Sequence, residues 1–98
     1  MTITEIISQI DNFADDVVIY AKKEAGKFTE SSDVCLIDLK EDELELSNRE
    51  IAQKYCIGFD YFLEVFIVKE ILSNLSIRGY VEINQNVLQI IHYAEFDA

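Results

Sequence analysis

The stretch FDYFLEVFIVKEILSNL, residues 59–75, constrains the fold more than any other part of this 98-residue chain. Helical spacing places five of its residues on one side of a predicted helix: Tyr61, Val65, Val68, Leu72 and Leu75. Four more widen the apolar surface beyond a single stripe: Phe59, Phe62, Leu63 and Phe66. A helix that is apolar over most of its circumference is normally contacted from several sides. We therefore expect a central helix at about residues 59–75, with other elements packed around it.

The polar arc of this predicted helix is narrow and contains two isoleucines, Ile67 and Ile71, beside Asp60, Glu64 and Asn74. These two side chains either pack against a second layer of structure or form an exposed apolar patch ringed by acids. Packing is the favoured interpretation. Exposure would make the pair an anchor for a protein partner.

The first half of the chain predicts one helix and two strands. Thr2 and Glu5 have the spacing of a capping box, in which each side chain bonds the backbone of the other residue at a helix start. Apolar residues then recur on one helical face: Ile3, Ile6, Ile7, Ile10 and Phe13. The β-branched stretches 17–21 and 34–39 predict two strands that can pair antiparallel.

The second half begins with another capping-box pattern, Ser47 and Glu50, and Gly58 is placed to end the short helix that follows. Residues 80–93 fit two structures, a hairpin or a helix capped by Asn84. The helix is slightly favoured because four apolar residues share one of its faces: Val87, Ile90, Ile91 and Ala94. These elements predict an α+β class, with a small antiparallel sheet packed against three to four helices in a single domain, residues 1–98.

A winged-helix arrangement is an alternative for the second half, with a wing formed by GYVEINQNVLQI. Its recognition helix would carry Asp60, Glu64 and Glu70 against Lys69 alone. Direct reading of DNA bases normally needs arginine, lysine, asparagine or glutamine side chains in the groove. If the architecture were present, we would expect a variant that binds protein.

The net charge of −11 is the strongest global feature, and residues 1–46 carry −8 of it. Contacts to phosphate need lysine and arginine, so this charge argues against binding to nucleic acid or to an anionic membrane. No apolar span reaches 18 residues, and the N-terminal residues lack the basic segment of a signal peptide. We therefore expect a cytoplasmic protein without a membrane helix.

Residues that could carry catalysis are scarce. His92 is the single histidine and lies in an apolar segment, which is typical of a structural histidine. The three glycines are isolated, and neither zinc-ligand spacing nor the spacing of an EF-hand loop occurs. We therefore expect no enzyme activity, no metal site and no cofactor.

The two cysteines, Cys35 and Cys56, both lie in apolar settings. Such settings are typical of buried thiols in a reducing cytosol, which is the favoured interpretation. The sequence leaves a disulfide between them open.

The second half, with EIAQKYCIGFDYFLEVFIVKEILSNL and the ending HYAEFDA, resembles small bacterial domains of unknown biochemistry. Those domains share the apolar pattern of the central helix and close on an aromatic pair followed by DAF. Here His92 precedes Tyr93 in place of a second tyrosine, and no phenylalanine follows Ala98.

In size and charge, the whole chain resembles the small acidic immunity proteins of bacterial contact-dependent and polymorphic toxin systems. That resemblance implies a protein that binds and blocks a cognate toxin domain in the cytoplasm, and it assigns no individual residue.

We therefore predict an immunity protein that neutralises a basic toxin domain, a nuclease, whose phosphate-binding surface an acidic inhibitor can occupy. The predicted contact residues are seven acids and three anchors: Glu30, Asp33, Asp38, Glu41, Asp42, Glu43, Glu45, Tyr61, Ile67 and Ile71. The alternative is a DNA mimic or regulatory adaptor that binds a nucleic-acid-processing protein, because it would have the same acidity.

Overall fold

The computed structural model describes residues 1–38 and 45–96 of the chain. In chain order, its elements are α1 (Ile3–Ser8), the 3-10 helix η1 (Ile10–Asn12), β1 (Val17–Ala21), β2 (Val34–Asp38), α2 (Asn48–Tyr55), β3 (Asp60–Glu64), α3 (Val65–Ile77) and α4 (Ile83–Phe96).

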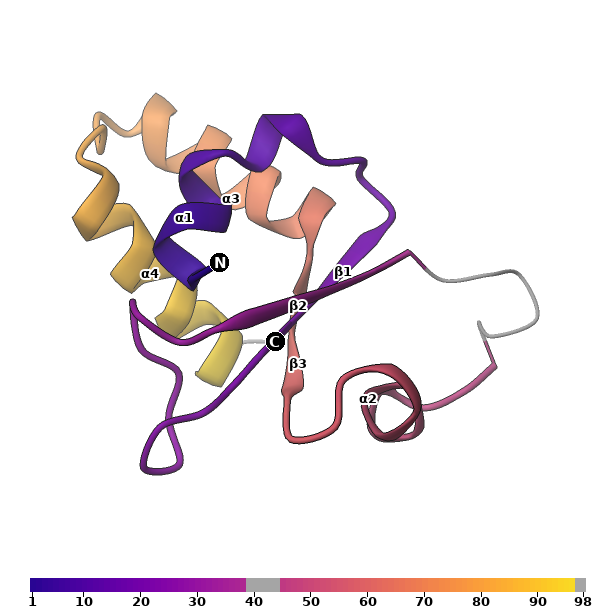
Figure 1. Cartoon of the computed structure of the whole chain (residues 1–98). Helices are drawn as coiled ribbons and strands as arrows, with labels where there is room; N and C mark the ends of the chain where they lie inside the picture. The colour runs from indigo at the N-terminus through magenta and orange to yellow at the C-terminus, as the bar shows by residue number, and fades with distance from the viewer. Residues whose placement is uncertain (39–44, 97–98) are drawn as a thin grey trace.

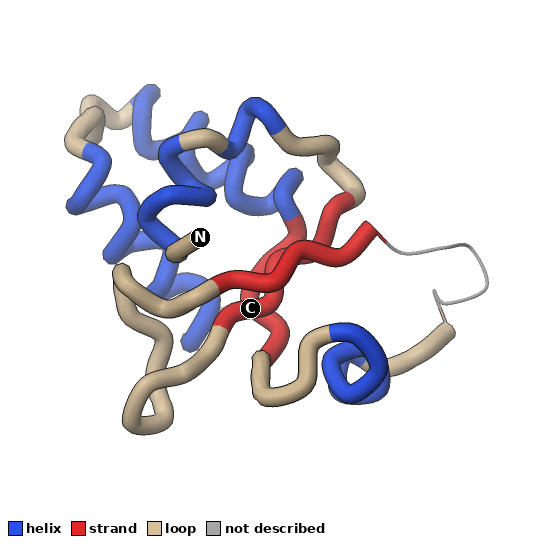
Figure 2. Tube along the Cα trace, viewed as in Figure 1, coloured by secondary structure: helices blue, strands red, loops and turns tan. Residues whose placement is uncertain are grey.

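A three-stranded antiparallel sheet in the order β2–β1–β3 forms the middle of the molecule. Helices α1, α3 and α4 gather on one side of it, and α2 lies on the other (Figure 1). Figure 2 shows the strands between these two groups of helices. The predicted α+β class, with a small antiparallel sheet packed against helices, is confirmed.

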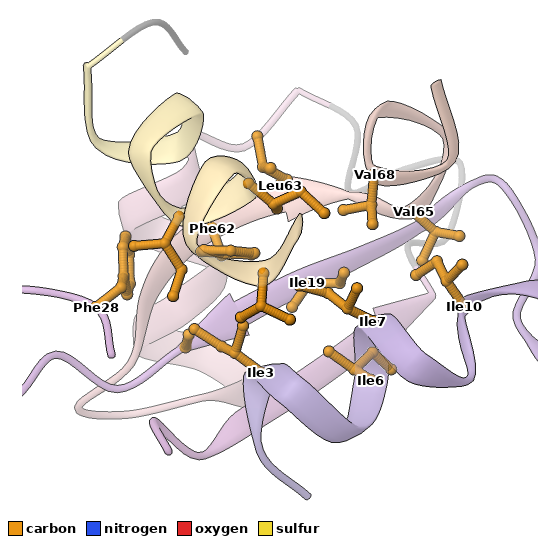
Figure 3. Packing of buried hydrophobic residues seen from close by; sticks show 14 residues of the cluster. Ile3, Ile6, Ile7, Ile10, Ile19, Phe28, Phe62, Leu63, Val65 and Val68 are labelled. Carbon is orange, nitrogen blue, oxygen red and sulfur yellow. The ribbon is translucent and has the colours of Figure 1, made fainter. Parts of the chain in front are cut away.

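The central strand β1 contributes to two separate hydrophobic cores, because successive residues of a strand point to opposite faces of its sheet. Ile19 and Ala21 belong to the main core, whereas Val18 and Tyr20 belong to a smaller core beside α2. The main core includes Ile3, Ile6, Ile7, Ile10, Ile19, Phe28, Phe62, Leu63, Val65 and Val68 (Figure 3). The smaller one, here called the α2 core, consists of Val18, Tyr20, Ile37, Ile51, Ala52 and Cys56.

A β-bulge in β3 directs two consecutive apolar residues into the main core. Ile19 of β1 pairs with Leu63, but the next residue, Tyr20, pairs with Tyr61, so Phe62 is the extra residue. Phe62 and Leu63 are both buried in the main core. Tyr61 therefore lies on the α2 side of the sheet, where it packs against the α2 core.

The central helix predicted at residues 59–75 is wrong in its first part. Residues 60–64 form β3, and α3 begins at Val65. Pairing with β1 overrides the helical spacing of Tyr61 and Val65, since β3 completes the sheet. The bulge also hides the strand from a sequence pattern, because Phe62 and Leu63 break the alternation of apolar and polar residues that predicts a strand.

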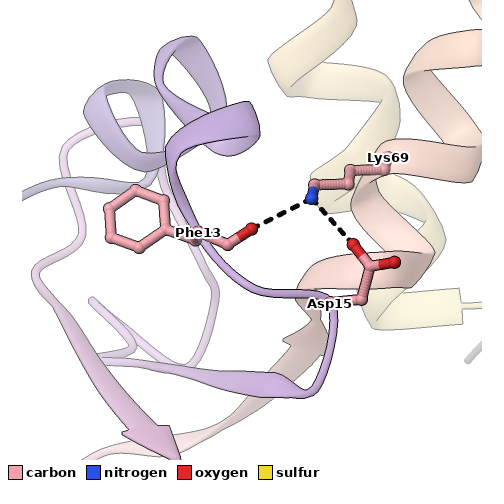
Figure 4. Close-up of polar contacts among 3 residues, drawn as sticks. All are labelled: Phe13, Asp15 and Lys69. Atoms are coloured by element: carbon pink, nitrogen blue, oxygen red, sulfur yellow. Dashed lines mark hydrogen bonds and ion pairs between the residues drawn. The ribbon is translucent and has the colours of Figure 1, made fainter.

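The remaining part of the predicted helix is central, as expected. In α3, Val65, Val68 and Leu75 are buried. Lys69 joins this helix to the segment before β1, since its ammonium donates to the Phe13 carbonyl at 2.9 Å and pairs with Asp15 at 2.7 Å (Figure 4).

Both predicted capping boxes are present. At α1, the Glu5 N–H donates to the Thr2 hydroxyl at 3.2 Å, and the Thr2 N–H donates to the Glu5 carboxylate at 3.2 Å. Ser47 and Glu50 make the equivalent pair of bonds at the start of α2. The predicted isoleucine face is also confirmed, because all four isoleucines from residue 3 to residue 10 are buried.

Residues 83–96 form the helix that was favoured over a hairpin, so the wing of a winged-helix arrangement is absent from this part of the chain. The tight turn before it is a Schellman motif: the N–H of Tyr80 donates to the Leu75 carbonyl at 2.8 Å and that of Gly79 to Ser76 at 3.0 Å. Gly79 has φ +90°, a conformation that glycine adopts without strain. The prediction that Asn84 caps the helix is wrong, because α4 starts at Ile83 and Asn84 lies within it.

Cys35 of β2 and Cys56 at the end of α2 form a disulfide, so the favoured interpretation of two free thiols is wrong. The sequence could not decide this, because the two residues come together only when α2 packs on the sheet face that carries Cys35. The bond crosses from the sheet to α2 and reinforces the α2 core, which has far fewer buried residues than the main core.

Replacing both cysteines by alanine should lower the free energy of unfolding by about 3 kcal/mol, because the disulfide closes a loop across a sequence separation of 21 residues. Urea denaturation with and without a reducing agent measures this. The wild-type midpoint should fall on reduction, and the midpoint of the Cys35→Ala, Cys56→Ala variant should not change. Thiol titration that finds two free thiols in native chain prepared without reductant would contradict the bond.

The bulge predicts unequal roles for two nearby phenylalanines. Phe62→Ala should lower the free energy of unfolding by about 3–5 kcal/mol, because it empties a fully buried position in the main core. Phe66 is 43% exposed, so Phe66→Ala should cost about 1 kcal/mol or less. Denaturant titration of the two variants compares them, and equal losses would be inconsistent with the inward orientation of Phe62.

Candidate functional site

The predicted acidic contact residues occupy three positions in the chain. Glu30 and Asp33 lie before β2, Asp38 is its last residue, and Glu45 lies before α2; all four are exposed. The other three predicted acids, Glu41, Asp42 and Glu43, lie outside the described residues.

The acids do not form one compact group, because β2 separates them. Asp33 and Asp38 lie at opposite ends of this strand, about 17 Å apart at roughly 3.3 Å per residue. Between them, Ile37 is buried, and Val34, Cys35 and Leu36 are half-buried. The structure thus places an apolar strand between two acidic ends.

No described side chain neutralises these four carboxylates, and hydrogen bonds hold the backbone at two of the acids, Glu30 and Asp33. The Glu30 carbonyl accepts from the Thr4 N–H at 3.2 Å and from its hydroxyl at 3.0 Å. Lys22 donates its N–H to the Asp33 carbonyl at 2.9 Å. Asp15, in contrast, is paired with Lys69. Glu30 and Asp33 therefore present their charges from a hydrogen-bonded backbone.

Tyr61 is half-buried, and its hydroxyl donates to the Glu64 carboxylate. Its ring stands edge-on to Tyr20 at 6.0 Å between centroids. Burial raises the pKa of Tyr61 well above its usual range, with a further contribution from Glu64, and the same two causes raise the pKa of Tyr20. The predicted anchor is thus engaged inside the protein, within a small group of two phenols and one carboxylate.

Ile67 and Ile71 are half-buried and pack against the main core. The favoured interpretation of second-layer packing agrees with this placement. The structure places them away from the acids around β2, because α3 continues directly from β3, which lies on the other side of β1 from β2.

Sequence reasoning missed three strongly exposed aliphatic residues: Ile57 (82% exposed), Ile77 (81%) and Val81 (80%). All three lie within two residues of a glycine and outside the periodic apolar segments, a position that could have predicted their exposure. Ile57 precedes Gly58 and follows Cys56, which is bonded to Cys35 of β2. Among the described residues that are strongly exposed and aliphatic, Ile57 is the one that the disulfide links most directly to β2.

A pocket of about 710 Å³ lies between α2, β3 and the residues after β1. Lys23 and Arg49 line it together with Asp60 and Tyr61. Its charge is mixed, and its described lining contains neither histidine nor cysteine.

His92 lines a smaller pocket of about 280 Å³ between α3 and α4, with Arg78 and Tyr93 nearby. Neither a cysteine nor an aspartate is among its described lining residues, so no nucleophile or carboxylate partner adjoins the histidine there. Within residues 1–38 and 45–96, no group of three or more histidine, cysteine, aspartate or glutamate side chains is placed to hold a metal ion. The same residues contain no helix with the length and hydropathy needed to cross a membrane.

In comparisons with protein-family models, curated proteins and solved structures, nothing matches this chain. The resemblance to immunity proteins therefore stays a prediction.

The raised pKa values of Tyr61 and Tyr20 predict a loss of stability in alkali. The fold favours the neutral phenols, so their contribution is complete below the usual phenol pKa of about 10 and is lost as pH rises through the higher folded values. Tyr61→Phe should flatten this loss, and at neutral pH it should cost about 1 kcal/mol through the missing hydrogen bond to Glu64.

The free energy of unfolding, measured between pH 8 and pH 12 for wild type and Tyr61→Phe, tests this prediction. Tyr80→Phe is the matched control, because Tyr80 is exposed and its ring lies against Arg78. Parallel pH profiles for wild type and Tyr61→Phe would rule out a role of this phenol in the alkaline loss.

Proposed function

We propose that the chain is an inhibitor of the immunity type, which binds a basic protein partner, a toxin nuclease domain, through an acidic surface. The observation that carries this proposal is the set of exposed acids around β2, which no described cation neutralises, in a chain with a net charge of −11. A nuclease presents a basic surface to nucleic acid, and these acids complement it.

The acids steer the partner more than they hold it, since an exposed ion pair contributes only about 0–1 kcal/mol. Tight binding therefore needs an apolar anchor at the centre of the contact. Tyr61 is engaged with Glu64, and Ile67 and Ile71 pack on the main core, so the proposed anchor is Ile57. Its neighbour Cys56 is buried in the α2 core, and Cys35 of β2 packs against this core, which keeps Ile57 close to the acidic strand.

A cytoplasmic location is part of this proposal. Thiol buffers in a reducing cytosol keep cysteines reduced, so the chain has to remain folded without its disulfide there. The main core contains neither cysteine and is the larger of the two, which supports folding in the reduced state.

A DNA mimic is less favoured by the described geometry. Duplex DNA carries one charge for about every 1.7 Å of its axis, so a mimic needs closely spaced carboxylates. Asp33 and Asp38 are separated by the apolar residues of β2, which fits a protein contact better.

The proposal predicts that reversing charge around β2 slows association with the partner. We expect the triple variant Asp33→Lys, Asp38→Lys, Glu45→Lys to bind at least about tenfold more slowly at low salt, since electrostatic steering raises association rates by about 10 to 10³. The partner is first captured by crosslinking and mass spectrometry in the source organism, and stopped-flow kinetics then compare the proteins at several salt concentrations.

The matched control is Asp11→Lys, Glu70→Lys, Glu82→Lys, which makes the same change in net charge at exposed acids outside β2 and its flanks. It should slow association much less. An acidic partner, or a captured nuclease whose activity the wild-type chain leaves unchanged at a 1:1 ratio, would refute the proposed function.

A further inference from the structure

Strand β2 is at an edge of the sheet, because β1 pairs with it on one side. The Lys22 N–H donates to the Asp33 carbonyl at 2.9 Å, which continues the ladder past Ala21 and Val34. In an antiparallel pair, residues bonded to the partner strand alternate with residues whose backbone groups point away. Cys35 and Ile37 therefore bond toward β1, whereas Val34, Leu36 and Asp38 point their N–H groups outward.

The N-terminal segment covers the beginning of this edge. The Val34 N–H donates to the Met1 carbonyl at 2.9 Å, and the Ile3 N–H donates to the Ser32 carbonyl at 3.0 Å. This pairing ends at Val34. Across the described ranges, the N–H and carbonyl of Leu36 and the N–H of Asp38 have no hydrogen-bond partner.

The open part of β2 also lacks three features that commonly protect natural edge strands. Such edges commonly carry lysine, proline or a bulge. The other edge strand, β3, has a bulge at Phe62. The sequence VCLID of β2 has none of the three, and its pairing with β1 is regular throughout.

We propose that the edge of β2 from Leu36 to Asp38 is a docking site for an extended, basic segment of a protein partner, which joins the sheet as a further strand. This inference rests on the proposed function and specifies how the partner is held. The backbone of Leu36 supplies a donor and an acceptor to the added strand, and Asp38 places a negative charge at the end of the open edge.

Charge selects the occupant of this edge. A basic strand brings lysine or arginine opposite Asp38, which is a favourable cross-strand arrangement; the position opposite Asp33 is already taken by Thr2. A second copy of this chain would instead oppose one acidic edge to another, and each copy carries −11. Like charges directly opposite each other destabilise strand pairing, so the edge accepts a basic segment and resists self-association.

The first experiment uses wild-type chain and a capped hexapeptide of alternating arginine and valine as the probe. Hydrogen exchange followed by NMR should show that the Leu36 amide exchanges rapidly in the free chain and at least tenfold more slowly with saturating peptide. Two control peptides have the same sequence and charge. One is N-methylated at alternate residues, which blocks the N–H groups along one of its edges, and the other is N-methylated along the opposite edge. They separate strand addition from electrostatic attraction, because methylation removes backbone donors and keeps the charge. At least one of them should bind at least tenfold more weakly.

The second experiment compares Leu36→Pro with Leu36→Ala. Both remove the half-buried side chain, but only proline also removes the outward N–H, and edge strands tolerate proline where that N–H faces solvent. Leu36→Pro should bind the unmodified peptide at least tenfold more weakly than Leu36→Ala. Circular dichroism checks the fold of both, and the methylated peptides test wild-type chain even if Leu36→Pro fails to fold.

Three results would overturn the inference: a Leu36 amide already protected in the free chain, equal binding of all three peptides, or self-association through this edge. These outcomes are separate from failure of the proposed function. If charge reversal slows association with the captured nuclease while Leu36→Pro and Leu36→Ala bind it equally, inhibition stands and strand addition is wrong. If the captured partner is acidic, the proposed function is wrong whatever the peptides do.

Discussion

The two-sided burial of β1 is the constraint on which the rest of this structure depends. Four of its five residues, Val18 to Ala21, are buried, and they alternate between the main core and the α2 core. A strand buried on both faces needs a cover on each side. Helices α1, α3 and α4 provide one cover, and α2 provides the other (Figure 1). The bulge at Phe62 makes the covers unequal, because it adds a second large side chain to the main core and leaves Tyr61 on the α2 side.

The smaller apolar content of the α2 side explains why the disulfide and the phenols of Tyr20 and Tyr61 lie there. The α2 helix has eight residues and buries two of them, Ile51 and Ala52, so it adds little hydrophobic energy of its own. The Cys35–Cys56 bond joins it covalently to the sheet. Under it, the Tyr61 hydroxyl donates to Glu64, which allows a carboxylate to stand at the sheet face without an opposite charge. The α2 side is thus held by specific bonds, and the main core by apolar volume.

Local patterns in the sequence predicted the structure correctly where the residues that determine an element lie within that element. The capping boxes at Thr2 and Ser47 and the isoleucine face of α1 depend on residues within a few positions of each other, and all of them were predicted. The start of α3 was not predicted, because β3 forms through its pairing with β1. The bulge in β3 also removes the alternation of apolar and polar residues by which a strand is predicted. The disulfide and the neighbourhood of Ile57 depend in the same way on α2 meeting the sheet, which no local pattern records.

The same distinction applies to the candidate binding surface. Acidity is a property of composition, so the sequence predicted a basic partner, and it placed Glu30, Asp33 and Asp38 in one set of contact residues. The fold places a strand between them, and that strand is an edge. An acid beside open backbone donors and acceptors differs from a simple acidic patch, because the backbone fixes the direction of a bound segment while the acid selects its charge. Specificity at this surface therefore comes from strand geometry and charge together. Charge alone would accept any basic protein, and strand geometry alone would accept any extended segment.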